Sequence, residues 1–269
     1  MARALVKTGV IVKIGIIGAA SMGQILAGKL IEAGHAVKVS NSRGPETLED
    51  IAAKTGATAV SVSDAVKDVD VVFIAIPTGA VPHLPNDLFE GVPEDVVVID
   101  ITNTFPWRDG LIQAFDDGVP ESRWVCAQIG RPVIKAFNTV GFPTLHAEGR
   151  PAGTPGRIAM PVAGDDARAK HIVLQLVEQL GFDAVDAGSL DDSWRQQPGT
   201  PAYCTDLDVH GVKEGLARAD TANARKRRDI ASEIFSGPGE NLPPVSDPKD
   251  LVAIIRAIYR AVNKMNPAA

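Results

Sequence analysis

Cysteine, aromatic residues and long uncharged hydrophobic runs are all scarce in this sequence. Only 5% of the 269 residues are aromatic, and the two cysteines are Cys126 and Cys204. These cysteines lie far apart, with no metal-ligand spacing and no disulfide framework, so we expect a cytoplasmic setting and no metal site. Because the sequence has no uncharged apolar stretch of roughly 18 residues or more, we expect no membrane-spanning helix.

An excess of positive charge is missing as well. The formal net charge is -6, which argues against a general affinity for nucleic acids or anionic membrane surfaces. Hydrophobic residues make up 45% of the chain, enough to bury a substantial core. We therefore expect a globular protein whose main partner is a small molecule.

Short runs of β-branched residues alternate with segments of helical length through the first two thirds of the chain. The expected strands are residues 12–17, 36–40, 57–60, 69–76, 96–101 and 133–137. Their continuous apolar character indicates strands covered on both faces, and residues 22–33 and 47–54 have the apolar spacing of helices. The pattern predicts an α/β fold with a Rossmann-type doubly wound parallel sheet, in the strand order 3-2-1-4-5-6.

The last third of the sequence continues this pattern and then becomes helical. Residues 157–163 and 181–187 are expected strands that extend the sheet on either side of a helix at 167–180. Further helices are expected at 206–234 and 249–264.

We divide the chain into a nucleotide-binding Rossmann domain, residues 10–190, and a small helical C-terminal region, residues 191–269. Apolar positions in residues 251–262 suit either a homodimer interface or docking onto the first domain. The basic cluster at 225–228, RKRR, is typical of a solvated helix face, and a phosphate-binding patch is the alternative.

A glycine turn joins the first expected strand to the first expected helix. In the segment GAASMG, Gly18 and Gly23 have the spacing of the first and third glycines of a dinucleotide-binding fingerprint. Ala20 stands where the second glycine is expected. The N–H groups of the helix that starts near Ser21 and Met22 would then meet a pyrophosphate.

The end of the second expected strand indicates which dinucleotide is bound. An NAD-binding chain usually has Asp or Glu there to hold the ribose hydroxyls. The segment VSNSRG instead contains Ser42 and Arg43 and no carboxylate. Because a guanidinium forks onto phosphate oxygens, we predict that these two residues bind the 2′-phosphate of NADP(H).

The fourth and fifth expected strands end near further candidate contacts. Ile76 and Pro77 follow the fourth strand, where the backbone is expected to line the ribose and nicotinamide, and Asn103 follows the fifth. Strand ends followed by turn residues are also ordinary architecture, which is the alternative for each position.

These segments together resemble a known family. Residues 18–23, 41–45 (NSRGP), 75–77 (AIP) and 135–138 (KAFN) are similar, in this order, to NADPH-dependent oxidoreductases related to coenzyme F420 reductases. The resemblance covers roughly residues 12–203. It implies a Rossmann domain that binds NADP, and a small C-terminal part that closes the acceptor pocket over the nicotinamide for direct hydride exchange with a deazaflavin. The KAFN segment also resembles metalloreductase domains that pass hydride to a flavin.

The resemblance also implies individual contacts. By position, Ala20, Ser21 and Met22 look like pyrophosphate contacts, Ser42 and Arg43 like 2′-phosphate contacts, Ile76 and Pro77 like nicotinamide contacts, and Asn138 like a neighbour of the hydride-transfer site.

The chemistry leaves three hypotheses. Hydride transfer between two planar rings needs proximity and exclusion of water but no dedicated acid, so NADPH with a deazaflavin or flavin acceptor is the first. The alternative is an NADPH-dependent ketone or imine reductase, whose proton donor would be Lys135 or Tyr203, the only catalytic candidates. A non-catalytic NADP(H) sensor is the third.

Overall fold

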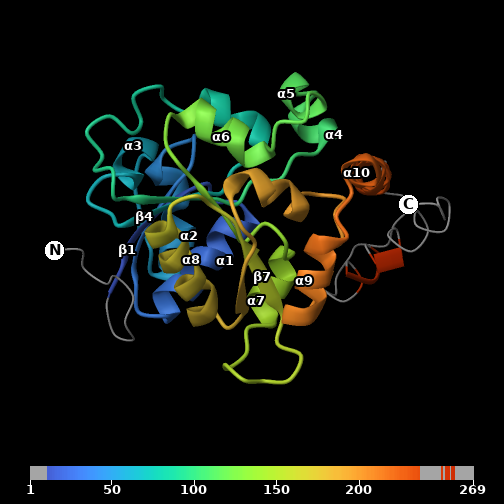
Figure 1. Ribbon diagram of the computed structural model, residues 1–269. Coiled ribbons are helices and arrows are strands. Elements are labelled where there is room, and N and C mark those ends of the chain that lie inside the picture. Colours follow the sequence, from blue (N-terminus) through green and yellow to red (C-terminus); the bar gives the residue numbers. More distant parts are fainter. Residues whose placement is uncertain (1–10, 237–249, 251, 255, 258–269) are drawn as a thin grey trace.

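The computed structural model describes residues 11–236, 250, 252–254, 256 and 257. Its centre is a parallel sheet in the order β3-β2-β1-β4-β5-β6 (Figure 1), which confirms the expected doubly wound topology. The strands of this sheet are β1 (Lys13–Ile17), β2 (Ala36–Ser40), β3 (Thr58–Ala59), β4 (Val71–Ile74), β5 (Val97–Asp100) and β6 (Ile134–Lys135).

Helices cover both faces of the sheet because the strands carry apolar side chains on both. In β4, Phe73 packs in the core beneath α1 (Ser21–Glu32) and α8 (Ala167–Gln179), while Ile74 packs on the opposite face. That opposite face is covered by α3 (Val62–Ala65), η2 (Thr78–His83) and α6 (Glu121–Ile129), which lie above the sheet in Figure 1. β4 and β5 are therefore buried throughout, and the carboxyl ends of the strands are the place where polar groups reach solvent.

The first helix agrees with expectation to within one residue at each end, while the segment expected at 47–54 is divided into η1 (Pro45–Leu48) and α2 (Glu49–Thr55). The remaining short helices of this part are α4 (Pro106–Asp109), α5 (Gln113–Asp116) and α7 (Phe142–Ala147).

The expectation that two more strands continue the main sheet is wrong. β7 (Ala159–Val162) and β8 (Asp183–Asp186) form a separate parallel pair, joined to the main sheet by one antiparallel bridge between Lys135 and Ala163. The positive φ of 60° at Phe137 ends the extended backbone after β6, so the edge offers too little length for a further parallel strand.

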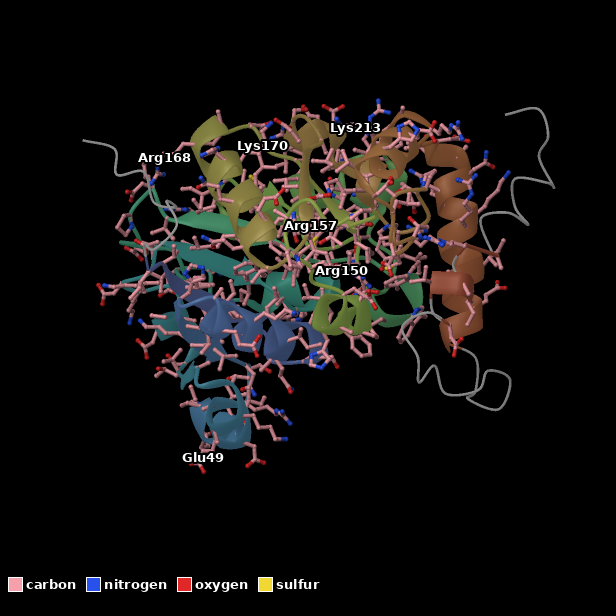
Figure 2. The ribbon with its side chains drawn as sticks, turned by 90° about the horizontal axis from the view of Figure 1, so that it is seen from below. Glu49, Arg150, Arg157, Arg168, Lys170 and Lys213 are labelled. Atoms are coloured by element: carbon pink, nitrogen blue, oxygen red, sulfur yellow. The ribbon has the colours of Figure 1, made fainter. Side chains whose placement is uncertain are left out.

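A buried guanidinium holds the β7–α8–β8 unit together. Arg157 is 2% exposed, and its Nη1 lies 2.6 Å from Glu178 Oε2 and 2.6 Å from Asp183 Oδ1 (Figure 2). Its Nε also donates to the backbone oxygens of Arg150 and Gly181. One side chain thus joins the C-terminal end of α8 to the start of β8.

The helix expected at 206–234 is two helices, α9 (Val209–Ala217) and α10 (Thr221–Ser236). Each helix has a capped start, because the side chain of Asp208 accepts from Gly211 N before α9 and that of Asp220 accepts from Ala222 N at the break before α10. η3 (Leu190–Gln196) precedes these two helices in the chain. α9 packs on β7 and β8, whereas α10 packs on α4.

Residues 250, 252–254, 256 and 257 of the segment expected at 249–264 are helical, and the rest of that segment lies outside the described residues, as does most of the expected 251–262 interface. In the part of the chain that the structure describes, no helix has the length and apolar character to cross a bilayer.

Candidate cofactor and acceptor site

The glycine turn after β1 is packed too closely for side chains. Gly18 has φ +116°, and a Cβ there would lie 2.1 Å from the backbone oxygen of Ala75 at the end of β4. A Cβ at Gly23 would lie 2.0 Å from the oxygen of Gly18. Both glycines are therefore needed for the turn itself and for seating α1 against the sheet.

The first turn of α1 is open to an anion. Ala20 is its N-cap in extended conformation, without a side-chain cap, and the first turn contains no acidic residue. The N–H groups of the first turn, including those of Ser21 and Met22, point out of the helix without intrahelical partners. This helix start combines free donors with the positive end of the helix dipole.

A hydrogen-bonded turn after β2 presents Ser42 and Arg43 to solvent. Asn41 Oδ1 accepts from the backbone N of Arg43 at 2.9 Å, and Asn41 Nδ2 donates to Thr47 Oγ1 at 2.9 Å. Thr47 Oγ1 donates in turn to Gly44 O at 2.8 Å. Ser42 and Arg43 are both exposed, and among the described residues no ion pair or side-chain hydrogen bond engages the guanidinium of Arg43. The turn therefore offers a hydroxyl and a guanidinium to a phosphate.

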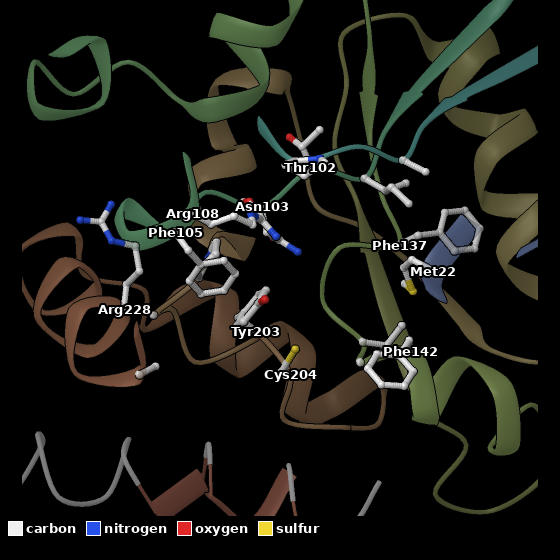
Figure 3. A pocket seen from close by; sticks show the side chains of 18 of the residues that line it. Met22, Thr102, Asn103, Phe105, Arg108, Phe137, Phe142, Tyr203, Cys204 and Arg228 are labelled. Carbon is white, nitrogen blue, oxygen red and sulfur yellow. Dashed lines mark hydrogen bonds between the residues drawn. The ribbon is translucent and has the colours of Figure 1, made fainter. Parts of the chain in front are cut away.

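A cavity of about 380 Å³ opens at the carboxyl ends of β4 and β5, within the range of about 300–1,000 Å³ that is usual for small-molecule sites. Six of the residues expected at the site line it: Ala20, Met22, Ile76, Pro77, Asn103 and Tyr203. Figure 3 shows Met22 at one end of this cavity and Arg228 of α10 at the other.

Asn138 lies behind the cavity wall rather than on it. Its side chain is 1% exposed, and its Nδ2 donates to Asn103 Oδ1 at 3.1 Å and to Gln196 O at 2.8 Å. Asn103 Nδ2 donates back to Asn138 O at 3.0 Å. The arrangement gives Asn138 the task of orienting Asn103, which does line the cavity.

Lys135 is also outside the lining. Its ammonium is fully buried, 3.1 Å from Asp100 Oδ2 and 2.5 Å from the backbone oxygen of Thr102. Asp100 also accepts from Ser122 Oγ at 2.7 Å and from the backbone N of Thr102 at 2.8 Å. These contacts hold the ammonium of Lys135 in the core, so we interpret Lys135 as a structural residue rather than one that contacts a ligand in the cavity.

Aromatic rings form much of the cavity wall. The rings of Phe105 and Tyr203 meet edge to face, with centroids 6.4 Å apart. Trp107 and Phe142 are half exposed at the same cavity. Sequence reasoning missed Phe105, Trp107 and Phe142, although all three follow strand ends or turns on the ligand-binding side of the sheet. Such walls suit a flat apolar ligand.

Arginines add positive charge to this apolar cavity. Arg108 of α4 and Arg227 and Arg228 of α10 line it, and none of the lining residues is Asp or Glu. The expectation of a solvated helix face at 225–228 therefore holds for Lys226 and is wrong for Arg227, which is 6% exposed, and for Arg228. Arg225 is exposed, but its guanidinium donates to the backbone oxygens of Phe115 and Asp116.

Cys204 lines the cavity beside Tyr203. Burial raises the pKa of its thiol to about 12, and the hydrogen bond with Tyr203 lowers it only partly. The thiol is therefore neutral at physiological pH and has none of the thiolate character that a nucleophile needs.

Comparisons with known proteins agree with this arrangement. A family model described as NADP oxidoreductase, coenzyme F420-dependent, matches residues 13–104. The crystal structure of the hypothetical protein SMa0349 from Sinorhizobium meliloti is 30% identical, with a TM-score of 0.62, over 73% of this chain and 95% of that protein. The chain belongs to the coenzyme F420-dependent NADP oxidoreductase family.

Two further relatives are similar to this oxidoreductase. The Escherichia coli (strain K12) protein YjhV is 39% identical over 90 residues, which are 34% of this chain and 66% of that protein, just under two thirds of its length. A candidate F420-dependent NADP-reductase from Arthrobacter sp. FB24 is 22% identical over 68% of this chain and 87% of its own, with a TM-score of 0.56, and shares the fold. The chain thus has a Rossmann-type nucleotide-binding fold, and the family to which it belongs is one of NADP oxidoreductases.

Proposed function

We propose that this oxidoreductase transfers hydride between NADPH and a ring-shaped acceptor, either a deazaflavin such as coenzyme F420 or a flavin. The observation that carries the proposal is the aromatic cavity, which starts at the open end of α1 and extends to α10. A flat acceptor stacked between the strand ends and the walls of Phe105 and Tyr203 would face the cofactor ring directly.

The same proposal assigns the cofactor contacts. The pyrophosphate would bind the N–H groups at Ala20, Ser21 and Met22, on the turn shaped by Gly18 and Gly23. The 2′-phosphate would bind Ser42 and Arg43, and the nicotinamide would lie against Ile76, Pro77 and Asn103, with Asn138 supporting Asn103. In this proposal the start of α1 binds the pyrophosphate, the turn after β2 binds the 2′-phosphate, and the cavity holds the nicotinamide.

The bound cofactor supplies the hydride, and the protein's residues position the two rings and exclude water. Tyr203 and Cys204, which line the cavity, are weak acids, and Lys135 is fully buried in an ion pair with Asp100. A ring acceptor needs no stronger acid, because its own ring system takes up the electron pair. This scarcity of acids favours a ring acceptor over a carbonyl.

The proposal includes a division of labour along the chain. Residues 10–190 would hold the cofactor, and residues 191–269 would close the acceptor pocket or contribute to a dimer. Support comes from α10, which supplies Arg227, Arg228 and Ala231 to the cavity wall.

A ketone or imine reductase is the second candidate, because Tyr203 does line the cavity. In that reaction a proton donor must stand within hydrogen-bond reach of the developing oxyanion or amine. Tyr203→Phe would then abolish turnover at unchanged NADPH affinity, and so would Lys135→Ala if that lysine were the donor. With a ring acceptor, Tyr203→Phe leaves most of the activity in place.

The test follows the loss of NADPH absorbance with a panel of coenzyme F420, free flavins, simple ketones and imines. Rapid oxidation by F420 or a flavin, with NADH a much poorer donor, supports the proposal. Turnover with a ketone or imine alone moves the assignment to the reductase. Tight NADPH binding without oxidation by any acceptor would instead indicate an NADP(H) sensor.

A further inference from the structure

A second, smaller cavity meets the aromatic cavity at Pro198 and Arg228, both of which line the two. This side pocket has a volume of about 150 Å³, room for several waters at about 30 Å³ each in the liquid. The residues that line this side pocket include Glu121, Trp194, Gln197, Pro198, Arg225 and Arg228. A ligand that fills the aromatic cavity can therefore extend past Arg228 into a space of different character.

The side pocket is lined by hydrogen-bond donors that are only partly used. Arg228 Nε and Nη2 both lie 2.9 Å from Asp229 Oδ1, whose side chain is 54% exposed, and Nη1 has no hydrogen bond to any described residue. Arg225 Nη2 donates to the backbone oxygens of Phe115 and Asp116, which leaves its Nε and Nη1 without hydrogen bonds among the described residues. Gln197 Nε2 is buried and has no partner in the same part of the chain. Donors without acceptors favour an oxyanion.

The charges around the side pocket point the same way. Arg225 and Arg228 face one acid on its wall, Glu121, which is 4% exposed and accepts from Thr104 N at 3.2 Å. Burial raises the pKa of Glu121 to about 7, so near neutral pH this carboxyl is partly protonated and does not cancel both guanidiniums. Asp116 lies 3.9 Å from Arg225 Nη1 and is 52% exposed, so this pair is well screened.

The position of Arg228 is fixed by the backbone. Gly199 has φ +89°, and a Cβ there would lie 1.9 Å from Ala224 O and 2.9 Å from Arg228 N. The loop that separates the two cavities thus packs directly on the helix that carries both arginines. This packing fixes the backbone from which the side chains of Arg225 and Arg228 reach the side pocket.

We propose that the side pocket is the anion subsite of the hydride acceptor, in which Arg225 and Arg228 bind a phosphate or carboxylate on the acceptor's tail. The inference rests on the proposed function, because it takes the aromatic cavity as the place of the acceptor ring. It specifies the substrate class further: a planar ring with an anionic side chain, rather than a neutral ring.

The experiment compares ligands with one ring and different tails. Dissociation constants of riboflavin and FMN are measured by calorimetry on the full chain saturated with NADP⁺, so that the cofactor site is occupied. Charge-assisted hydrogen bonds predict that FMN binds about 10- to 100-fold more tightly. Lumiflavin and its N10-carboxymethyl analogue form a second pair, which tells a carboxylate tail from a phosphate tail.

Variants locate the effect. Arg225→Gln should lower FMN affinity toward that of riboflavin and leave riboflavin affinity unchanged, because Arg225 lines the side pocket and not the aromatic cavity. Arg228→Gln should lower FMN affinity by a larger factor than riboflavin affinity, because Arg228 lines both. The matched control is Arg218→Gln, at the C-cap of α9, a residue 75% exposed, which changes the net charge equally outside both cavities. Equal affinities for charged and neutral flavins, or an equal loss from Arg218→Gln, overturn the proposal.

Turnover of riboflavin separates this inference from the proposed function, since riboflavin has the ring without the anion. Reduction of riboflavin without preference for an anionic tail leaves the function standing and removes the subsite. An FMN preference that depends on Arg228, without reduction of either flavin, keeps the subsite and removes a flavin as the hydride partner. Failure of all four flavins to bind overturns the subsite together with a flavin as the acceptor.

Discussion

The ammonium of Lys135 lies 3.1 Å from the carboxylate of Asp100, and both side chains are completely buried where β5 and β6 end. Asp100 also accepts from Ser122 Oγ and from the backbone N of Thr102. The pair therefore joins the end of the sheet to α6 and to the segment that enters the cavity. A buried pair with this many partners fixes local geometry, and loss of one member leaves the other charge unpaired.

We expect Lys135→Met to lower the free energy of unfolding by about 3–5 kcal/mol, because Asp100 then stays buried without its partner. Urea denaturation measures the loss. The control is Lys67→Met, which removes an exposed lysine paired with Asp64 and should cost no more than about 1 kcal/mol. Asp100→Asn in the Lys135→Met background should recover part of the stability. Full stability of Lys135→Met combined with lost turnover would instead make Lys135 catalytic.

Arg43→Ala should weaken NADPH binding about 10- to 100-fold, because a charge-assisted contact contributes about 1.5–3 kcal/mol. NADH lacks the 2′-phosphate, so its affinity should barely change. Fluorescence titration with both nucleotides gives the comparison, and Arg218→Ala provides an exposed arginine elsewhere as the control. Equal losses for the two nucleotides would remove Arg43 from 2′-phosphate recognition.

Thr47→Val should weaken NADPH binding about 2- to 10-fold without contacting the nucleotide, since its hydroxyl joins Asn41 to Gly44 and a net hydrogen bond contributes about 0.5–1.5 kcal/mol. NADH affinity should fall less, because this turn presents Ser42 and Arg43, the proposed 2′-phosphate contacts. Thr47→Ser keeps the hydroxyl and should restore wild-type selectivity. An unchanged NADPH to NADH ratio in Thr47→Val would show that Ser42 and Arg43 reach their positions without this network.

The sheet and its glycine turn were predictable because their signals are local. Gly18 is required by a backbone angle and by the oxygen of Ala75, and the strands are continuous β-branched runs. The two C-terminal helices had a usable local signal as well: Asp208 and Asp220 are N-caps, which a search for capping residues within the expected single helix would have found.

The acceptor side of the site was not predictable in the same way. A run of four basic residues in a helix does not show which of their side chains face the cavity. That orientation depends on how α10 packs on the loop at Gly199, which a local pattern does not contain. The same holds for Asn138: its motif marks a place near the site, but only the fold shows that Asn103 lies between it and the cavity. Side-chain roles that depend on packing between distant segments are absent from local patterns.

Glu121 predicts how stability depends on pH. Burial raises its pKa from 4.5 to about 7, so the folded chain holds this proton more tightly than the unfolded chain. The contribution to the free energy of unfolding is fully present below pH 4.5, falls as pH rises to about 7, and is then lost, a change on the order of 3 kcal/mol. Glu121→Gln keeps an acceptor for Thr104 N and cannot ionise, so it should remove this slope and be more stable than the wild type at pH 8. Urea unfolding between pH 5 and 8 measures both, with the exposed Glu32→Gln as a control that leaves the slope in place. A slope that persists in Glu121→Gln would assign the titration to another group.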